Sequence, residues 1–144
     1  MLQNSIKIRI NYCHTDKMGY VYYGNYPAFY EMGRTELFRE INLAPLDLEK
    51  KGIMLPVRKL DVEYFAPAYY DELIEVNTHL VDYSPLKITL GTEILNSSGQ
   101  MVNKGKVELI MVDTETGRPK RSYEIYEYVK EKVGDYEERT NKQA

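Results

Sequence analysis

The sequence has very little cysteine, and this scarcity excludes one class of small protein. Cys13 is the single cysteine among 144 residues, so no disulfide can form within the chain. Because a disulfide-stapled extracellular domain needs paired cysteines, we expect a cytoplasmic protein. Residues 1–7 also lack the basic-then-apolar pattern of a secretory signal peptide, which favours the same compartment.

Long apolar runs and an excess of positive charge are missing as well. No stretch approaches the roughly 18 consecutive apolar residues of a membrane-spanning helix, so we expect a soluble protein without a membrane span. The 19 Lys and Arg stand against 22 Asp and Glu, a net charge of -3, which gives no general attraction for nucleic acid. Any anionic ligand must therefore be held by local groups.

Metal-ligand and nucleotide-binding motifs are also absent. His14, His79 and Cys13 do not have the spacing of a metal site, and His79 reads as an ordinary residue on a sheet surface. No Gly-rich phosphate loop or dinucleotide fingerprint occurs. We predict neither a metal nor another cofactor.

What the chain does contain is the pattern of one folded domain. Its length fits a single core, and 43% of its residues are hydrophobic, including 14 Tyr. We predict one domain over residues 1–133, followed by a polar, frayed tail over residues 134–144.

Apolar residues change their period along the chain. A helical period follows Gly24, with Pro27 tolerated in the first turn, and predicts about four to five turns up to Ile41. Ser122 can cap a shorter helix that runs to Val133, and residues 96–99 suit a hairpin turn. Alternating apolar residues predict five strands, around residues 6–12, 60–64, 74–80, 88–94 and 107–111.

This order predicts an α+β fold in which one long helix packs on a five-stranded antiparallel sheet. One helix covers only part of such a sheet, so an edge or face stays available for a second copy. We therefore expect a homodimer, and a tetramer of two such dimers is also compatible.

The segment between the first strand and the helix, residues 12–26, carries the chemistry. It combines the Asp16 carboxylate, Gly19 and Gly24, several tyrosines and a helix N-terminus, whose unpaired N–H groups can stabilise an oxyanion. Asp16 can supply an attacking or proton-accepting carboxylate. The alternative is that Asp16 only caps a turn, as many loop aspartates do.

A long pattern of residues runs through this segment, the following helix and the next strand. It consists of Arg9-Ile10, Thr15-Asp16, Gly19, Val21, Tyr26, Phe29-Tyr30-Glu31, Arg34-Thr35, Val57-Arg58-Lys59, Val62-Glu63-Tyr64 and Ala66-Pro67-Ala68. This pattern resembles that of the hotdog-fold acyl-CoA thioesterases of the 4-hydroxybenzoyl-CoA and Tol-Pal-associated types, and the resemblance reaches about Pro119. There are two departures: Tyr20 stands where an aliphatic residue is usual, and Tyr23 stands where Tol-Pal-associated members carry histidine.

The resemblance implies a hotdog fold and hydrolysis of an acyl-CoA thioester to a free acid and CoA. Asp16 is then the catalytic carboxylate, as nucleophile or general base, and the N–H groups near Tyr23 and Gly24 receive the carbonyl oxygen. It also implies active sites between two subunits. The expected substrate-binding residues of the loop are Tyr12, Gly19, Tyr22 and Tyr26, although Tyr12 could equally pack in the core.

Because CoA carries phosphates, cations should lie at the mouth of the site. The candidates are Lys87, Lys120 and Arg121, for which a solvated basic turn is the alternative.

Other residues have both a functional and a plain interpretation. His14 could shuttle a proton. Cys13 reads as a buried or half-buried spectator rather than a nucleophile. Glu31 could be a second carboxylate, but we favour an ion pair with Arg34 or a neighbour.

Two rival functions remain at this point. The chain could hydrolyse thioesters of an acyl carrier protein, or it could be an acyl-CoA-binding module without turnover. Retention of Asp16 and Gly19 argues against the second rival.

Overall fold

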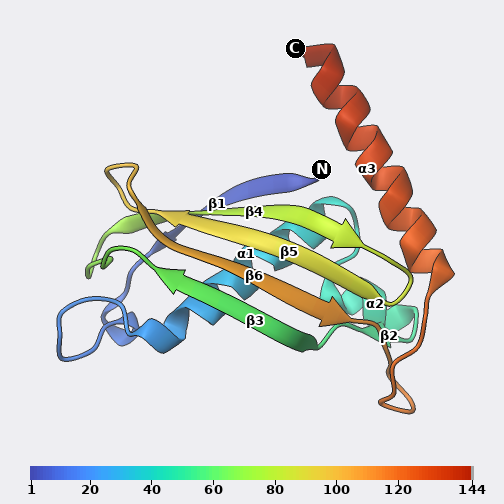
Figure 1. Ribbon diagram of the computed structural model, residues 1–144, viewed down its shortest axis with the longest axis horizontal. Coiled ribbons are helices and arrows are strands. Elements are labelled where there is room, and N and C mark those ends of the chain that lie inside the picture. The colour runs from blue at the N-terminus through green and yellow to red at the C-terminus, as the bar shows by residue number, and fades with distance from the viewer. Residues whose placement is uncertain (144) are drawn as a thin grey trace.

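Five long strands form one twisted antiparallel sheet in the computed structural model, which describes residues 1–143 (Figure 1). The sheet order is β1-β4-β5-β6-β3, and each neighbouring pair is antiparallel. The expected α+β architecture is confirmed. The strands are β1 (Gln3–Arg9), β3 (Val57–Tyr64), β4 (Leu73–Tyr83), β5 (Lys87–Leu95) and β6 (Met101–Ile110).

One long helix, α1 (Tyr26–Glu40), crosses one face of this sheet (Figure 1). A 3-10 turn, η2 (Tyr23–Asn25), leads into it, so the helix begins just after Gly24, as the sequence predicts. Pro27 lies in the first turn, where no helical hydrogen bond is lost. The helix turns its apolar side, including Phe29 and Leu37, toward the strands, and both side chains are buried.

Tyr30 makes the central contact between helix and sheet. Its buried hydroxyl donates a hydrogen bond to Asn103 Oδ1 in the interior of β6. The ring lies directly over Gly105, where any Cβ atom would overlap it. Burial is the main cause of a raised pKa at Tyr30, so the phenol stays protonated and remains a hydrogen-bond donor.

Short elements complete the two ends of the sheet. Strand β1 ends earlier than expected because the chain turns into η1 (Tyr12–His14). Helix α2 (Pro45–Lys50) leads to β2 (Ile53–Met54), which pairs with β7 (Val112–Asp113). The expected hairpin between β5 and β6 is confirmed, since Asn96 Oδ1 accepts the N–H groups of Ser98 and Gln100.

Helix α3 (Tyr123–Gln143) is longer than the sequence suggested. Its start is confirmed, because Ser122 Oγ accepts the Ile125 N–H. Residues 134–143, which we expected to form a frayed tail, continue this helix, and Ala144 lies outside the described residues. The helix continues because Tyr136 packs against the core and Glu137 pairs with the N-terminal ammonium group. No helix within residues 1–143 is long and apolar enough to span a membrane.

Strand β3 is the edge of the sheet that α1 covers least. Within residues 1–143 it is hydrogen-bonded only to β6, which leaves its other side open. Three large side chains of this strand remain exposed, namely Val57 at 48%, Leu60 at 40% and Tyr64 at 50%. An open edge with exposed apolar side chains is a natural surface for pairing with another strand.

The Tyr30 contact predicts a measurable loss of stability. In Tyr30→Phe, Asn103 Oδ1 loses its donor, and Asn103 Nδ2 already has no partner among residues 1–143. An unsatisfied buried polar group costs about 1–3 kcal/mol, so urea unfolding should show a free energy lower by that amount. Tyr123→Phe, at a 63% exposed position, is the control. Equal unfolding midpoints for both variants would contradict this role of Tyr30.

Candidate active site

The loop between β1 and α1 folds back on itself as a small hairpin. Thr15 and Val21 form an antiparallel bridge, and the Asp16 N–H donates to the Tyr20 carbonyl at 3.2 Å. The turn closes with the Gly19 N–H donating to the Asp16 carbonyl at 3.0 Å. Gly19 has a φ of 86°, a left-handed conformation that favours glycine. Gly19 therefore shapes the turn that carries Asp16.

Asp16 lies at the tip of this hairpin with its side chain exposed. Its Oδ1 atom accepts the Met18 N–H at 2.9 Å, which is the turn-capping interaction that the sequence left open. Its Oδ2 atom receives no hydrogen bond from any residue between 1 and 143. One oxygen thus holds the turn while the other stays free to act on a ligand.

The carbonyl oxygen of His14 ties the two arms of the loop together. It accepts the Tyr22 N–H at 2.9 Å and Asn25 Nδ2 at 2.8 Å. The His14 ring turns away from Asp16, since Nδ1 accepts the Asn11 N–H at 2.9 Å and the ring packs edge-on against Phe29. His14 therefore anchors the loop in this arrangement. The Asn25 amide is therefore a tether between the loop and the start of α1.

Two backbone N–H groups at the entrance to α1 are unoccupied. Within the described chain, the N–H groups of Tyr23 and Gly24 donate to no backbone carbonyl. The Tyr23 carbonyl accepts a hydrogen bond from the Tyr64 hydroxyl at 2.7 Å. Free N–H groups just before a helix are suited to receive a developing negative charge.

Aromatic side chains line this end of the molecule. The rings of Tyr22 and Tyr23 lie 4.7 Å apart, and both are exposed, whereas Tyr26 is buried. The pKa of Tyr22 is raised mainly by the neighbouring Tyr23 side chain, and the negative charge of Asp16 raises it further. Burial raises the pKa of Tyr26 to about 12.

Tyr12 is 80% exposed, so packing in the core, one of the two interpretations of this residue, was wrong. Cys13 was also misjudged, because it is exposed rather than buried or half-buried. Both residues belong to η1, whose three residues contain no buried side chain.

Glu31 and Arg34 do not form the expected ion pair among residues 1–143. Burial lowers the pKa of Arg34, and the Glu31 carboxylate raises it in part without direct contact. Both line a hollow of about 330 Å³ next to α2 and the start of β3. An ion pair between Arg39 and Glu36 forms one turn further along the helix.

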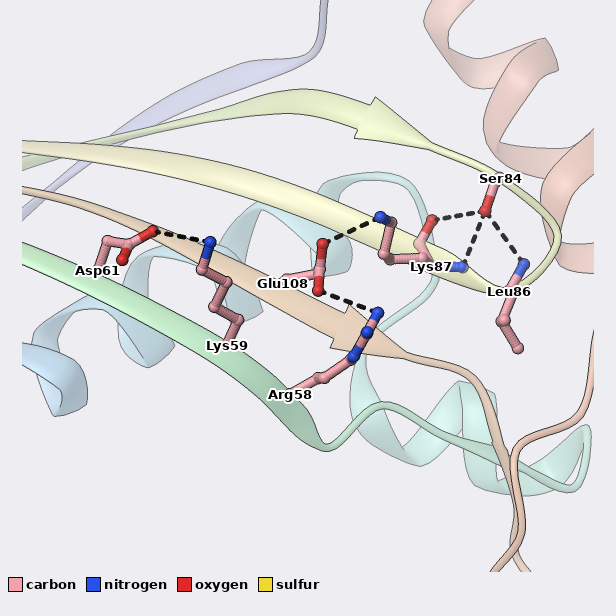
Figure 2. A network of polar contacts seen from close by, with 7 residues as sticks. All are labelled: Arg58, Lys59, Asp61, Ser84, Leu86, Lys87 and Glu108. Atoms are coloured by element: carbon pink, nitrogen blue, oxygen red, sulfur yellow. Dashed lines mark hydrogen bonds and ion pairs between the residues drawn. The ribbon is translucent and has the colours of Figure 1, made fainter.

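The three candidate cations lie at the opposite end of the sheet from Asp16. Lys87 begins β5, and the segment with Lys120 and Arg121 follows β7. Figure 2 shows Glu108 between Lys87 and Arg58, at 3.0 and 3.3 Å. Lys120 lies 3.5 Å from Asp113. A strand rises about 3.3 Å per residue, so the two ends of β3, and with them the two ends of the sheet, lie roughly 23 Å apart.

Clusters of three or more His, Cys, Asp or Glu able to hold a metal ion do not occur within residues 1–143.

Comparison with known proteins identifies the family. Residues 10–133 match the family described as the Thioesterase-like superfamily, and the chain therefore belongs to it. The fold and the family together define a hotdog-fold thioesterase.

Individual relatives match over most of their length. The chain is 36% identical to YneP of Bacillus subtilis (strain 168) over 113 residues, which cover 78% of this chain and 82% of YneP. It is 32% identical to the acyl-CoA thioester hydrolase YbgC of Escherichia coli O6:H1 over 113 residues, covering 78% and 84%. A solved DHNA-CoA thioesterase from Staphylococcus aureus superposes with a TM-score of 0.87 at 31% identity, covering 97% and 96%.

The Asn25 tether predicts a specific loss of order in the loop. Asn25→Asp removes the N–H donor to the His14 carbonyl and places a carboxylate against it. Loss of such a hydrogen bond costs about 1 kcal/mol, so amide exchange of Tyr22, which shares the same carbonyl, should accelerate about fivefold.

Asn96→Asp is the matched control for this exchange measurement. Asn96 caps its turn through Oδ1, which aspartate retains. Unchanged Tyr22 exchange in Asn25→Asp, measured by NMR under conditions where exchange reports local opening, would refute the tether.

Proposed function

We propose that this protein is an acyl-CoA thioesterase whose catalytic carboxylate is Asp16. The observation that carries the proposal is the loop geometry within a thioesterase-family chain. A carboxylate with one free oxygen stands on the same short loop as the unoccupied N–H groups of Tyr23 and Gly24. CoA as the carrier is supported by the names of two relatives, an acyl-CoA thioester hydrolase and a DHNA-CoA thioesterase.

The reaction consumes one water and releases a carboxylic acid and the CoA thiol. The thioester carbonyl oxygen lies at the N–H groups of Tyr23 and Gly24, which stabilise the negative charge that develops there. In one route, the free Asp16 oxygen removes a proton from the water that attacks the carbonyl carbon. In the other, this oxygen attacks the carbonyl carbon itself and forms a mixed anhydride, which the water then hydrolyses to the free acid and the Asp16 carboxylate. In both routes the CoA sulfur leaves and is protonated. Both routes use the same residues, and neither needs a cofactor.

Two copies of the chain are needed to complete this site. The free oxygen of Asp16 and the exposed rings of Tyr22 and Tyr23 face solvent in one copy. Pairing of β3 with β3 of a second copy about a two-fold axis is antiparallel and covers the exposed Leu60. In that arrangement, the start of one β3 lies beside the end of the other.

The same pairing explains the distant cations. In one chain, Lys87 begins β5 and Lys120 and Arg121 follow β7, at the end of the sheet opposite the loop of residues 12–26. A two-fold partner brings its own cationic end next to this loop, where the CoA phosphates can contact it. Lys87 and Lys120 are only partly buried in their pairs with Glu108 and Asp113, so a phosphate can compete for them.

The decisive assay measures thiol release from a panel of short, long and aromatic acyl-CoAs. A parallel panel of acyl carrier protein thioesters separates the first rival function. Turnover of the carrier-protein substrates alone would replace CoA as the carrier. Tight acyl-CoA binding with no thiol release would instead favour the non-catalytic binding module.

Asp16→Asn tests the carboxylate without removing the turn. Asparagine keeps an Oδ1 atom that can accept the Met18 N–H, so the loop should retain its fold. The kcat on the best acyl-CoA should fall by at least about 10², because a general base or nucleophile has been removed. Binding of an inert substrate analogue should persist.

A capping aspartate outside the loop provides the matched control. Asp47 Oδ2 accepts the Ala44 N–H at 3.1 Å at the start of α2. Asp47→Asn should leave kcat unchanged. If Asp16→Asn kept wild-type kcat as well, Asp16 would be only a turn cap, and Glu31 would be the next carboxylate to test.

Leu60→Asp tests the shared edge. The wild-type chain of 16.9 kDa should sediment as a dimer or a larger even assembly at micromolar concentration. A charge at this exposed edge position should shift the protein to a monomer and lower kcat about tenfold or more, because the partner completes the site. Leu46→Asp, at a 71% exposed position on α2, is the control. A wild-type monomer, or full activity of a monomeric variant, would exclude a site shared between subunits.

A further inference from the structure

Tyr64 ends β3 beside the catalytic loop, and its hydroxyl has one partner. The phenol donates to the Tyr23 carbonyl at 2.7 Å. Its ring packs edge-on against Tyr23 at 6.4 Å and against Tyr26 at 5.6 Å, measured between centroids. The ring is therefore held by two aromatic neighbours, and these contacts link the sheet edge to the entrance of α1.

The Tyr23 carbonyl and the Gly24 N–H belong to the same peptide group. Cis peptide bonds are absent throughout residues 1–143, so these two groups point in opposite directions across a plane. A hydrogen bond that fixes the carbonyl also fixes the direction of the N–H. Such a bond further polarises the peptide, which makes its N–H a stronger donor.

Gly24 also lies directly under the exposed Tyr22 ring, which a side chain at this position would displace. A Cβ atom at this position would lie 2.6 Å from Cε1 of the Tyr22 ring. Its N–H donates to no backbone carbonyl in residues 1–143. The peptide is therefore held from the carbonyl side by Tyr64, while its N–H remains available to a ligand.

We propose that Tyr64 is a positioning residue of the oxyanion site. Through its hydrogen bond to the Tyr23 carbonyl, it fixes the direction of the Gly24 N–H and makes this group a stronger donor to the thioester carbonyl oxygen. This inference rests on the proposed thioesterase function. Tyr64 touches no reacting atom in this role and acts only through the peptide.

The protonation state of the phenol is consistent with this role. Burial is the first cause that raises the pKa of Tyr64, and the neighbouring Tyr23 adds to it. The hydroxyl therefore stays protonated at neutral pH and keeps its donor.

Tyr64→Phe separates the hydroxyl from the ring. Phenylalanine keeps the packing against Tyr23 and Tyr26, so folding and assembly should persist. Removal of an entire oxyanion donor costs about 10² to 10³ in rate, and a donor that is only misaimed should cost less. We expect kcat to fall about 5- to 30-fold with KM within about twofold of wild type.

Tyr69→Phe is the matched control. Tyr69 is 50% exposed at the same end of the molecule, and its hydroxyl forms no hydrogen bond within the described chain. Its ring packs edge-on against Tyr20, a contact that phenylalanine retains. Both kinetic constants should stay at wild-type values in this variant.

Two further readouts distinguish positioning from general support. The NMR resonances of the Tyr23 carbonyl carbon and the Gly24 amide should move in Tyr64→Phe and stay in place in Tyr69→Phe. Binding should be compared for two inert CoA analogues. In one, a methylene replaces the thioester carbonyl, and in the other a methylene replaces the sulfur so that a ketone remains. Only the ketone can accept a hydrogen bond from the Gly24 N–H. Tyr64→Phe should therefore lower the affinity for the ketone about threefold and leave the affinity for the thioether unchanged.

Each outcome has a distinct meaning. If the Tyr23 and Gly24 resonances did not move, Tyr64 would not fix the orientation of the peptide between these two residues. Moved resonances with wild-type kcat, or equal losses of affinity for both analogues, would overturn its catalytic role. Absence of thiol release from every acyl-CoA by the wild-type protein would refute the proposed function and this inference together. Wild-type turnover with an unaffected Tyr64→Phe variant would refute this inference alone.

Discussion

Helix α1 lies against the sheet through Phe29, Tyr30 and Leu37, and the Tyr30 hydroxyl reaches Asn103 inside β6. Gly105 provides the space for this ring. Because the contact joins the first half of the helix to the start of β6, next to the edge strand β3, it fixes where the helix N-terminus emerges. The loop that carries Asp16 and the N–H groups of Tyr23 and Gly24 takes its position from that point.

Backbone hydrogen bonds then convert this position into a defined loop. The His14 carbonyl holds both Tyr22 and Asn25, and the Val21 N–H donates to the Ala68 carbonyl at 2.9 Å. The loop is thus joined to α1 on one side and to the segment after β3 on the other. An exposed carboxylate can therefore have a fixed place without being buried. Its charge stays solvated in the single chain, and desolvation comes only when another surface covers it.

Periodicity was sufficient for the elements but not for the contacts between them. Alternating and helical apolar patterns located the five strands, α1 and the Ser122 cap, because these patterns report which face of an element is buried. They underestimated α3, whose last turns depend on Tyr136 and on the chain terminus. The resemblance directed attention to Asp16. Neither source revealed the Asn25 and Tyr64 hydrogen bonds, since both join residues distant in sequence, 11 and 41 positions apart, to backbone carbonyls.

The distribution of charge and exposed aromatic surface favours a site divided between two chains. One end of the sheet presents Asp16 among exposed tyrosines, and the other presents Lys87, Lys120 and Arg121. A CoA thioester carries its phosphates far from its reacting carbonyl, so a ligand bound by both ends must span two surfaces. The open edge of β3 lies between them and has exposed apolar side chains that water solvates poorly. The proposed two-fold pairing at this edge would cover those side chains and bring the two kinds of surface together. The same strand ends in Tyr64, whose hydroxyl donates to the Tyr23 carbonyl, so this residue would lie next to both the proposed subunit contact and the proposed N–H donors.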